Sequence, residues 1–468
     1  MLFHKDLYDS IKQFVKKDTI RFHMPGHNGG EGLSSRLKRD FFRLDVTEFE
    51  ETDNLIAPQG ILKDAQTRAA KVFGAGQTYF LTCGSTVGLE AMILGACPKG
   101  SSLLVDRNCH RAVISAMILG GITPVFLYPE WDAEHHIWRG FTGAQVENTL
   151  KKHTECVGAL ITSPTYYGVC SEIEEIANLL HGQEKFLLVD EAHGAHFAFS
   201  EFLPRTAMEQ GADACVQSLH KTLPALGQSA VLHIGKNTIV SHETIVRSLR
   251  LLHTTSPSYL MLTGMDEAVK TMQGKGAKHL HALIQKCEDI KTKIRILNRL
   301  TVTDERALSC PQDALRLVVS FNRLGISGRT AAKILQKQYG IYAEMADSCH
   351  VVFLVSAGNT EKELDLLESA LEEIAVGQPS DPQMQPQDLL LPPIAMAQLP
   401  ETAFSAPRET IPLSKAEGRI CAELIASCPP GAAAVIPGQL LSAEVLHYLR
   451  RQEGISAIAV VQEAEAVS

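Results

Sequence analysis

Two residues whose side chains could do chemistry each follow a short apolar run. Asp190 comes directly after residues 186–189, and Lys221 lies shortly after residues 214–216. An acidic residue at a strand end is often only a cap, and a lysine is usually a solvated surface charge, so neither is informative alone. The neighbours of Lys221 are small hydrogen-bond donors suited to a phosphate, namely Ser218, His220 and Thr222. A lysine in such surroundings can form an imine with a carbonyl compound.

A turn rich in glycine and hydroxyl residues could provide further phosphate contacts. Residues 82–88 read Thr-Cys-Gly-Ser-Thr-Val-Gly and precede a helical pattern. Gly84 lets the backbone approach an anion, Ser85 and Thr86 offer hydroxyl groups, and the start of a helix adds free N–H groups. Alone, this pattern is better explained by an ordinary N-capped turn. Together with Lys221 it becomes a candidate phosphate site.

A third candidate is His110, which follows the apolar run at 102–105 after a short polar segment. This position would place the imidazole at the carboxyl edge of a sheet, where the ring could stack on a planar cofactor. A loop histidine satisfied by its neighbours is the alternative, and it would be the better one without the other candidates. His110 is therefore a candidate site residue only in combination with Lys221 and Asp190.

The segment 190–196 also raises the question of a metal site. It holds two carboxylates and two histidines, namely Asp190, Glu191, His193 and His196. The metalloprotease helix needs the spacing H-E-x-x-H, which puts both imidazoles on one face, whereas here Gly194 interrupts a segment that leaves a strand. A metal ion is therefore the minor alternative, and we predict no metal cofactor.

The elements that must position these residues are those of an α/β protein. From about 78 to 235, short apolar runs alternate with helical patterns, which indicates βα units around a mostly parallel sheet. Apolar runs without alternation predict strands buried on both faces. The expected strands are 102–105, 123–128, 159–162, 186–189 and 230–234 and, in a second unit, 315–321 and 350–356. Such sheets bind ligands at the carboxyl ends of their strands, so we expect the candidate residues there.

Several units are expected, because single cores stop growing near about 250 to 300 residues and this chain has 468. Residues 1–258 would hold the N-terminal segment and the major domain, and residues 259–376 a small α+β domain. Residues 377–413 are rich in Pro and Gln without an apolar period, which indicates an extended connection. Residues 414–468 would form a C-terminal domain.

Composition narrows the classes of function. A net charge of −9 and a pI near 6.1 argue against a nucleic-acid or anionic-membrane partner. The 11 cysteines are an odd number without a C-x-x-C pair, which fits neither a disulfide framework nor a zinc site and implies a reducing compartment. The N-terminus lacks the apolar core of a secretion signal. We therefore expect a cytoplasmic enzyme that acts on small molecules.

Taken together, these segments resemble the fold-type I ornithine, lysine and arginine decarboxylases, in the shorter bacterial form without an N-terminal receiver-like wing. The shared motifs extend to the C-terminal domain and leave out only the Pro/Gln-rich connection. They are FHMPGH at 22–27, DVTE at 45–48, GST at 84–86, RNCH at 107–110, SPTYYG at 163–168, DEAHG at 190–194, SLHKTLPA at 218–225, TTSPSY at 254–259, PPG at 429–431 and PG at 437–438.

The resemblance implies the PLP-dependent transferase fold (fold-type I), with pyridoxal 5′-phosphate as cofactor. Lys221 would hold the cofactor as a Schiff base, Asp190 would pair with the protonated pyridine nitrogen, and His110 would stack on the ring. These three are the implied catalytic residues, and His193 would line the cofactor's edge. The implied phosphate contacts are Gly84, Ser85, Thr86, Ser218 and His220. The implied reaction converts lysine, arginine or ornithine to its amine and carbon dioxide.

Two further residues would complete the site by the same resemblance. Thr255 lies in a segment that related enzymes lend to the neighbouring subunit, so we expect a homodimer or a larger homo-oligomer. Gln439 stands where a glutamate is usual, and a neutral side chain there would weaken or redirect recognition of the substrate's distal cation. Asn28 and Gly227 are two other departures, from a lysine and a threonine.

Two other functions stay open on the sequence. An aminotransferase or aldolase on the same fold would also need Lys221 and Asp190, although the surroundings of His110 and Lys221 favour decarboxylation. A weakly active homologue that regulates or binds a partner is suggested by Gln439 and the alanine-rich residues 432–435.

Overall fold

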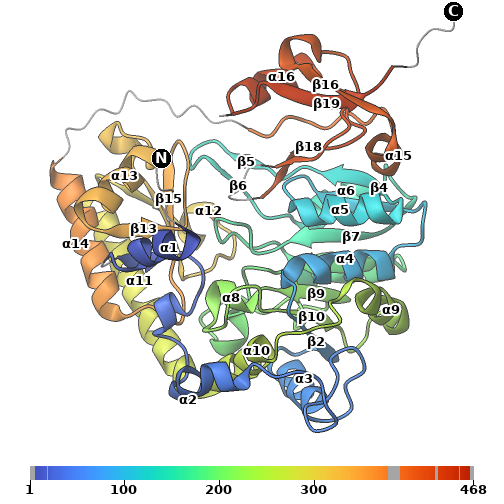
Figure 1. Ribbon diagram of the computed structural model, residues 1–468. Helices are drawn as coiled ribbons and strands as arrows, with labels where there is room; N and C mark the ends of the chain where they lie inside the picture. The colour runs from blue at the N-terminus through green and yellow to red at the C-terminus, as the bar shows by residue number, and fades with distance from the viewer. Residues whose placement is uncertain (1–5, 18, 378–389, 427–430, 453, 464–468) are drawn as a thin grey trace, which may run out of the picture.

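A seven-stranded sheet forms the centre of the large unit (Figure 1). The computed structural model describes residues 6–17, 19–377, 390–426, 431–452 and 454–463. The strands are β2 (Gln77–Leu81), β3 (Ser102–Asp106), β4 (Thr123–Leu127), β7 (Cys156–Thr162), β8 (Phe186–Asp190), β9 (Ala214–Gln217) and β10 (Ala230–Ile234). They lie in the order β2-β10-β9-β8-β7-β3-β4. Only β10 runs antiparallel to its neighbours, so the mostly parallel sheet predicted from the sequence is confirmed.

The five strands predicted for this sheet are all present. Their ends shift slightly, and β7 begins earlier than expected, at Cys156. The sequence does not predict β2 or β9. Gln77 and Gln217 leave these two strands with few consecutive apolar residues, so neither stands out as a buried run.

Helices cover both faces of the sheet. One face carries α4 (Gly84–Ala96), α5 (Arg111–Gly120) and α9 (His242–Leu252), and the other carries α6 (Gly143–Leu150) and α7 (Ile173–His181). Along β3, Leu103 and Val105 pack into the first core, whereas Leu104 packs into the second. Because both faces are buried, the strands read as apolar runs without alternation. A short hairpin, β5 (Trp131–Asp132) and β6 (Ile137–Trp138), precedes α6.

A four-stranded antiparallel sheet forms the small unit together with long helices (Figure 1). The strands are β11 (Thr301–Thr303), β12 (Arg316–Ser320), β14 (Met345–Ala346) and β15 (His350–Leu354), in the order β11-β12-β15-β14. The helices are α10 (Tyr259–Thr271), α11 (Ala277–Leu297), α12 (Glu305–Leu308), α13 (Gly328–Gln338) and α14 (Glu361–Gly377), with a π-helical turn, Met272–Gly276, between α10 and α11. Both strands predicted here, β12 and β15, are confirmed. Strands β11 and β14 are too short to show an apolar pattern from which a strand could be predicted.

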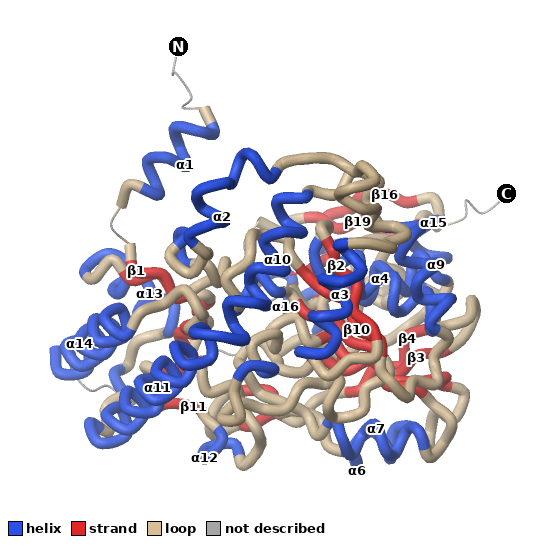
Figure 2. Tube along the Cα trace, turned by 90° about the horizontal axis from the view of Figure 1, so that it is seen from below, coloured by secondary structure: helices blue, strands red, loops and turns tan. Residues whose placement is uncertain are grey.

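The N-terminal segment divides its contacts between the two units. It contains α1 (Leu7–Val15), β1 (Ile20–Phe22), α2 (Ser35–Asp40) and α3 (Ile61–Val72). Strand β1 pairs in parallel with β13 (Ile341–Ala343) of the small unit, whereas the core side chains of α3 join the cluster that holds Phe73 and Phe80. Helix α1 buries none of its residues and stands off the body of the molecule in Figure 2.

A C-terminal unit packs beside β4 and α5 (Figure 1). It contains α15 (Pro400–Ser405), β16 (Arg408–Pro412), β17 (Ile425–Ala426), β18 (Ala433–Val435), α16 (Ala443–Arg450) and β19 (Ala457–Val461). The expected extended connection, 377–413, is therefore wrong for its later part, which carries α15 and β16. Strand β16 is held by pairing with the distant β19, a contact that no local pattern reveals. Residues 378–389 lie outside the described part, and the domain boundaries remain a prediction.

No helix among the described residues combines the length and the apolar character needed to cross a membrane.

Candidate active site

Lys221 lies at the carboxyl edge of the large sheet, in the short helix α8 (Leu219–Thr222). This helix follows β9, whose parallel neighbour β8 ends at Asp190. Because parallel strands bring their carboxyl ends to one edge, the order of the strands places these two residues together. The Lys221 Nζ atom lies 3.0 Å from Nε2 of His193, three residues beyond Asp190. The edge of the sheet thus joins three predicted site residues.

Asp190 is only 3% exposed. Its Oδ1 accepts the Ala192 N–H at 3.1 Å. A carboxylate can accept several hydrogen bonds, so Asp190 has capacity for a further donor such as a protonated ring nitrogen. Burying a carboxylate is costly unless a cation or donor pairs with it, which favours a functional partner for Asp190.

His110 joins the same edge from β3. It is the N-cap of α5, and its Nδ1 accepts the Ala112 N–H at 3.2 Å. Burial lowers the pKa of His110, and the nearby charges of Asp190 and Lys221 also act on it. The three residues predicted to be catalytic are thus within electrostatic reach of one another.

Polar groups suited to a phosphate surround the start of α4. The helix begins at Gly84 and its N-cap, Cys83, provides no side-chain hydrogen bond, so the first backbone N–H groups are not capped by it. Ser85 is half-buried and Thr86 exposed. Gly88 of this helix packs on Val216 of β9, which keeps the helix start near the segment of Lys221.

Two residues beside Lys221 add further phosphate donors. Ser218 is fully buried, and its Oγ has no hydrogen-bond partner among the described residues. His220 donates from Nδ1 to the Ser229 carbonyl at 3.0 Å, because a carbonyl can only accept, so Nε2 is its available nitrogen. An orphaned buried hydroxyl and an uncapped helix start fit a bound phosphate group.

The other polar residues of segment 190–196 have partners elsewhere. Glu191 accepts from Gln217 Nε2 at 2.7 Å, and burial raises its pKa to about 8. His196 Nε2 lies 2.9 Å from Asp313 Oδ1. Glu191 and His196 thus bind different neighbours, while His193 faces Lys221.

The segment after β1 links the small unit to the helix of Lys221. The Gly26 N–H donates to the His220 carbonyl at 2.7 Å, and the Gly26 carbonyl accepts the Gly358 N–H at 3.0 Å. A Cβ atom at Gly26 would lie 2.7 Å from the Leu223 carbonyl oxygen, so only glycine permits this approach. This contact gives a structural reason for the glycine of the FHMPGH motif.

Arg107 anchors the C-terminal unit at the rim of the site, a role that the sequence did not suggest. Its guanidinium is buried and donates to the carbonyl oxygens of Pro392 (2.8 Å), Ala433 (2.7 Å) and Ala434 (3.2 Å). Next to it, the Arg111 N–H donates to the Gly431 carbonyl at 2.9 Å. The C-terminal unit therefore reaches the residues that flank His110.

Thr255 and Gln439, the two further residues implied by the resemblance, differ in exposure. Thr255 is exposed, as a residue that contacts a second subunit would be in one chain alone. Gln439 is 0% exposed within the C-terminal unit. Its Oε1 accepts the Ile436 N–H at 3.2 Å and its Nε2 donates to the Pro393 carbonyl at 3.4 Å. In this arrangement the Gln439 amide serves packing of the C-terminal unit.

The other two departures have local explanations. Asn28 adopts a φ of +45°, which asparagine tolerates better than most residues, and its Nδ2 donates to Glu363 Oε1 at 3.0 Å. A Cβ atom at Gly227 would meet no atom within 4 Å, so this position has room for a larger residue.

A small cavity of about 210 Å³ lies beside the cluster, between the large sheet and the C-terminal unit. Asp106, Thr162, Tyr166 and Tyr448 are among its lining residues. Burial raises the pKa of Asp106 to about 6. The cavity brings a second buried acid close to the site, which the sequence did not single out.

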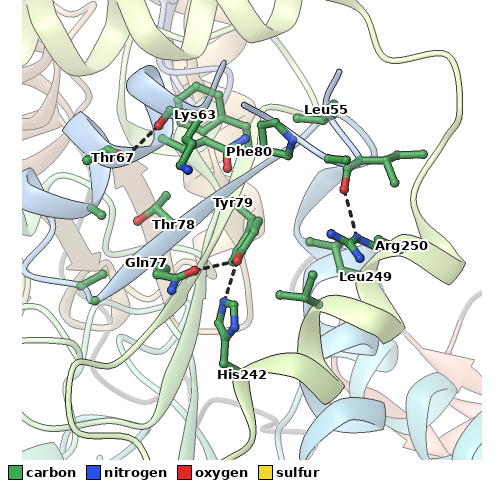
Figure 3. A pocket seen from close by; sticks show the side chains of 18 of the residues that line it. Leu55, Lys63, Thr67, Gln77, Thr78, Tyr79, Phe80, His242, Leu249 and Arg250 are labelled. Atoms are coloured by element: carbon green, nitrogen blue, oxygen red, sulfur yellow. Dashed lines mark hydrogen bonds between the residues drawn. The ribbon is translucent and has the colours of Figure 1, made fainter. Parts of the chain in front are cut away.

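A larger cavity of about 650 Å³ opens between α3, β2 and α9 (Figure 3). Tyr79 lines it, with its hydroxyl 2.6 Å from His242 Nε2. Arg250 donates to the Ile56 carbonyl at 3.1 Å on its far wall. None of the residues predicted for the active site lines this cavity.

The chain is similar to known proteins over most of its length. Residues 5–311 match the major domain of the Orn/Lys/Arg decarboxylases, and residues 384–457 match their C-terminal domain. An arginine decarboxylase of Halalkalibacterium halodurans is 34% identical over 95% of this chain and 92% of its own, and one of Bacillus subtilis is 32% identical over the same shares. The crystal structure of a Francisella novicida lysine decarboxylase, 18% identical, superposes with a TM-score of 0.77 over 98% of this chain and 84% of its own. The chain belongs to the Orn/Lys/Arg decarboxylase family and is an amino-acid decarboxylase, a lyase.

Proposed function

We propose that this enzyme uses pyridoxal 5′-phosphate to decarboxylate a basic amino acid, with arginine as the first substrate to test. The observation that carries the proposal is the contact of Lys221 Nζ with His193 beside the buried Asp190. The two relatives described above, 32% and 34% identical over 95% of this chain, are named arginine decarboxylase, which supports the choice of substrate.

Different residues at the carboxyl edge of the large sheet would bind different parts of the cofactor. Ser218 and the first N–H groups of α4 would bind its phosphate. When bound, pyridoxal phosphate supplies a conjugated ring that accepts the electron pair left on the substrate as carbon dioxide departs. Asp190 would keep the ring nitrogen protonated, and His110 would fix the ring in its plane. The C-terminal unit, anchored by Arg107, would help to exclude water from that edge.

Reduction with borohydride tests the lysine. We expect a yellow protein whose absorbance the reagent abolishes while it fixes the cofactor to a peptide that contains Lys221, since that lysine has the surrounding phosphate donors. Lys221→Met should remove the label. Lys291→Met is the matched control, because Lys291 is buried and forms an ion pair with Glu288. Label on another lysine, or none after reconstitution, would overturn the assignment. Incubation of holoenzyme with arginine, lysine and ornithine, followed by identification of the amine, decides the substrate.

We expect the active unit to be a homodimer in which Thr255 reaches the partner's site. Subunits that carry Lys221→Met and subunits that carry Thr255→Trp should each be nearly inactive alone. After mixing and exchange, about a quarter of the sites would hold neither defect, so activity should return. Sedimentation measures the assembly. A fully active monomer, or no recovery from a mixture shown to contain heterodimers, would contradict this prediction.

A further inference from the structure

Two buried side chains, Arg316 and His193, form a continuous row behind the Lys221 amine. Arg316, the first residue of β12, is 0% exposed, and its Nη2 lies 3.1 Å from Nδ1 of His193. The other ring nitrogen of His193, Nε2, lies 3.0 Å from Lys221 Nζ. His193 is 7% exposed and packs edge-on against the ring of Tyr166, with ring centroids 4.9 Å apart. The row thus connects the small unit to the reactive lysine.

The chemistry of the donors fixes which nitrogen of His193 carries its proton. A guanidinium has only donors, so Nδ1 must present a lone pair to Arg316. Burial, reinforced by the positive charges near the ring, of which Lys221 comes before Arg316, holds the pKa of His193 well below its usual range, and the neutral ring therefore has its one proton on Nε2. An Nε2–H aimed at Lys221 needs an acceptor, which is the lone pair of a neutral amine. That is the form in which a lysine attacks a carbonyl.

The position of Arg316 is itself built into the fold. Gly168 has a φ of +84°, and a Cβ there would lie 2.7 Å from Arg316 Cβ, so a glycine at this position makes room for the arginine. The Arg316 N–H donates to the Asp313 carbonyl at 3.0 Å, and its Nε lies 4.0 Å from Asp313 Oδ2. Its Nε and Nη1 have no hydrogen-bond partner among the described residues. Burying such a charge with few partners is costly, which argues for a role beyond packing.

We propose that Arg316 is a positioning residue that holds His193 as a hydrogen-bond donor to Lys221, so that His193 does not act as a proton acceptor at this nitrogen. The charged or titratable groups that act on His193 are Lys221 and His220 from α8, Arg316 from β12 and His110 from the start of α5. The meaning of this row for catalysis rests on the proposed function, but the tautomer of His193 does not.

Nitrogen-15 NMR of the cofactor-free protein, with labelled histidine, tests the tautomer directly. The signals of His193 are identified by their loss in His193→Gln. In the wild type we expect a protonated Nε2, an unprotonated Nδ1 and no titration between about pH 5.5 and 8. Arg316→Met should give mixed tautomers, because Nδ1 loses its donor while burial keeps the ring neutral, whereas Arg316→Lys should restore the wild-type pattern. If Arg316→Met does not fold, the wild-type spectrum alone decides, because a proton on Nδ1 overturns the proposal.

The rate of imine formation by the cofactor-free enzyme with added pyridoxal phosphate gives a second readout. With Arg316→Met, rings that carry their proton on Nδ1 would present the Nε2 lone pair to Lys221 and favour its ammonium form, so the midpoint of the pH profile should move upward by about half a pH unit or more. His193→Gln should show no such shift, because an amide can accept from Arg316 and still donate to Lys221. Coincident profiles for Arg316→Met and wild type would overturn the proposal. Absence of any imine would reject the proposed function instead, while the NMR result would still stand.

Discussion

Replacement of Asp190 by alanine is expected to lower turnover by at least about a hundredfold, which corresponds to roughly 2.7 kcal/mol of transition-state stabilisation. The reason is that the buried carboxylate would hold a proton on the cofactor's ring nitrogen, and a neutral ring accepts electrons poorly. The contacts of Lys221, Ser218 and α4 remain in this variant, so the cofactor should still bind. Turnover and cofactor absorbance are measured on the same preparation.

Asp213→Asn is the matched control for Asp190→Ala. Asp213 is also buried, but it precedes β9, at the opposite edge of the sheet, where it accepts the Leu187 and Ile239 N–H groups at 2.8 Å each. Its substitution should lower the free energy of unfolding by about 1–3 kcal/mol and leave turnover per folded holoenzyme near the wild-type value. Near-normal turnover by Asp190→Ala would refute the electronic role. If Asp190→Ala does not fold, Asp190→Asn provides the same comparison with a smaller change in shape.

Replacement of Arg107 by methionine is expected to lower the free energy of unfolding by about 3–5 kcal/mol. Methionine fills much of the space but donates no hydrogen bond, so the carbonyl oxygens of Pro392, Ala433 and Ala434 would be left without this donor. The C-terminal unit should therefore detach first. Denaturant unfolding gives the magnitude, and limited proteolysis shows whether cleavage begins after residue 390.

Arg68→Met provides the comparison for Arg107→Met. Arg68 is half exposed and forms an ion pair with Asp266 on the surface, so its loss should cost about 1 kcal/mol or less. Equal destabilisation by the two substitutions, or a C-terminal unit no more sensitive to protease in Arg107→Met, would contradict the anchoring role.

The sequence predicts best those elements and site residues that a periodic pattern or a local motif marks. The strands of the large sheet were recognisable because burial on both faces makes residues such as Leu103, Leu104 and Val105 uniformly apolar. Asp190 and His110 could be expected together because each follows a predicted apolar strand, and carboxyl ends of parallel strands share one edge. Lys221 follows only the short apolar run 214–216, which is not predicted as a strand. No such rule predicts strand β16, because it forms by pairing with the distant strand β19.

Arg316 and Arg107 show the same limit within the site. Arg316 lies 123 residues from His193 along the chain, inside a strand that the sequence predicts only as an apolar run. Arg107 stands in a motif that drew attention to His110 instead. In both cases the partner is an atom brought in by folding, a ring nitrogen or backbone carbonyls, and a single sequence gives no signal for it. A buried charge inside an apolar run is the one clue that could have marked Arg316.

The strap formed by residues 20–28 has a mechanical consequence. Through β1 it is paired with β13 of the small unit, and through Gly26 it is hydrogen-bonded both to Gly358 of that unit and to His220 beside the reactive lysine. A rotation of the small unit relative to the large sheet must therefore either break the Gly26 to His220 hydrogen bond or carry helix α8 with it. A rotation that opens or closes the enzyme would therefore change the position or the hydrogen bonding of the helix that carries Lys221. The exchange rate of the Gly26 amide hydrogen would report that motion.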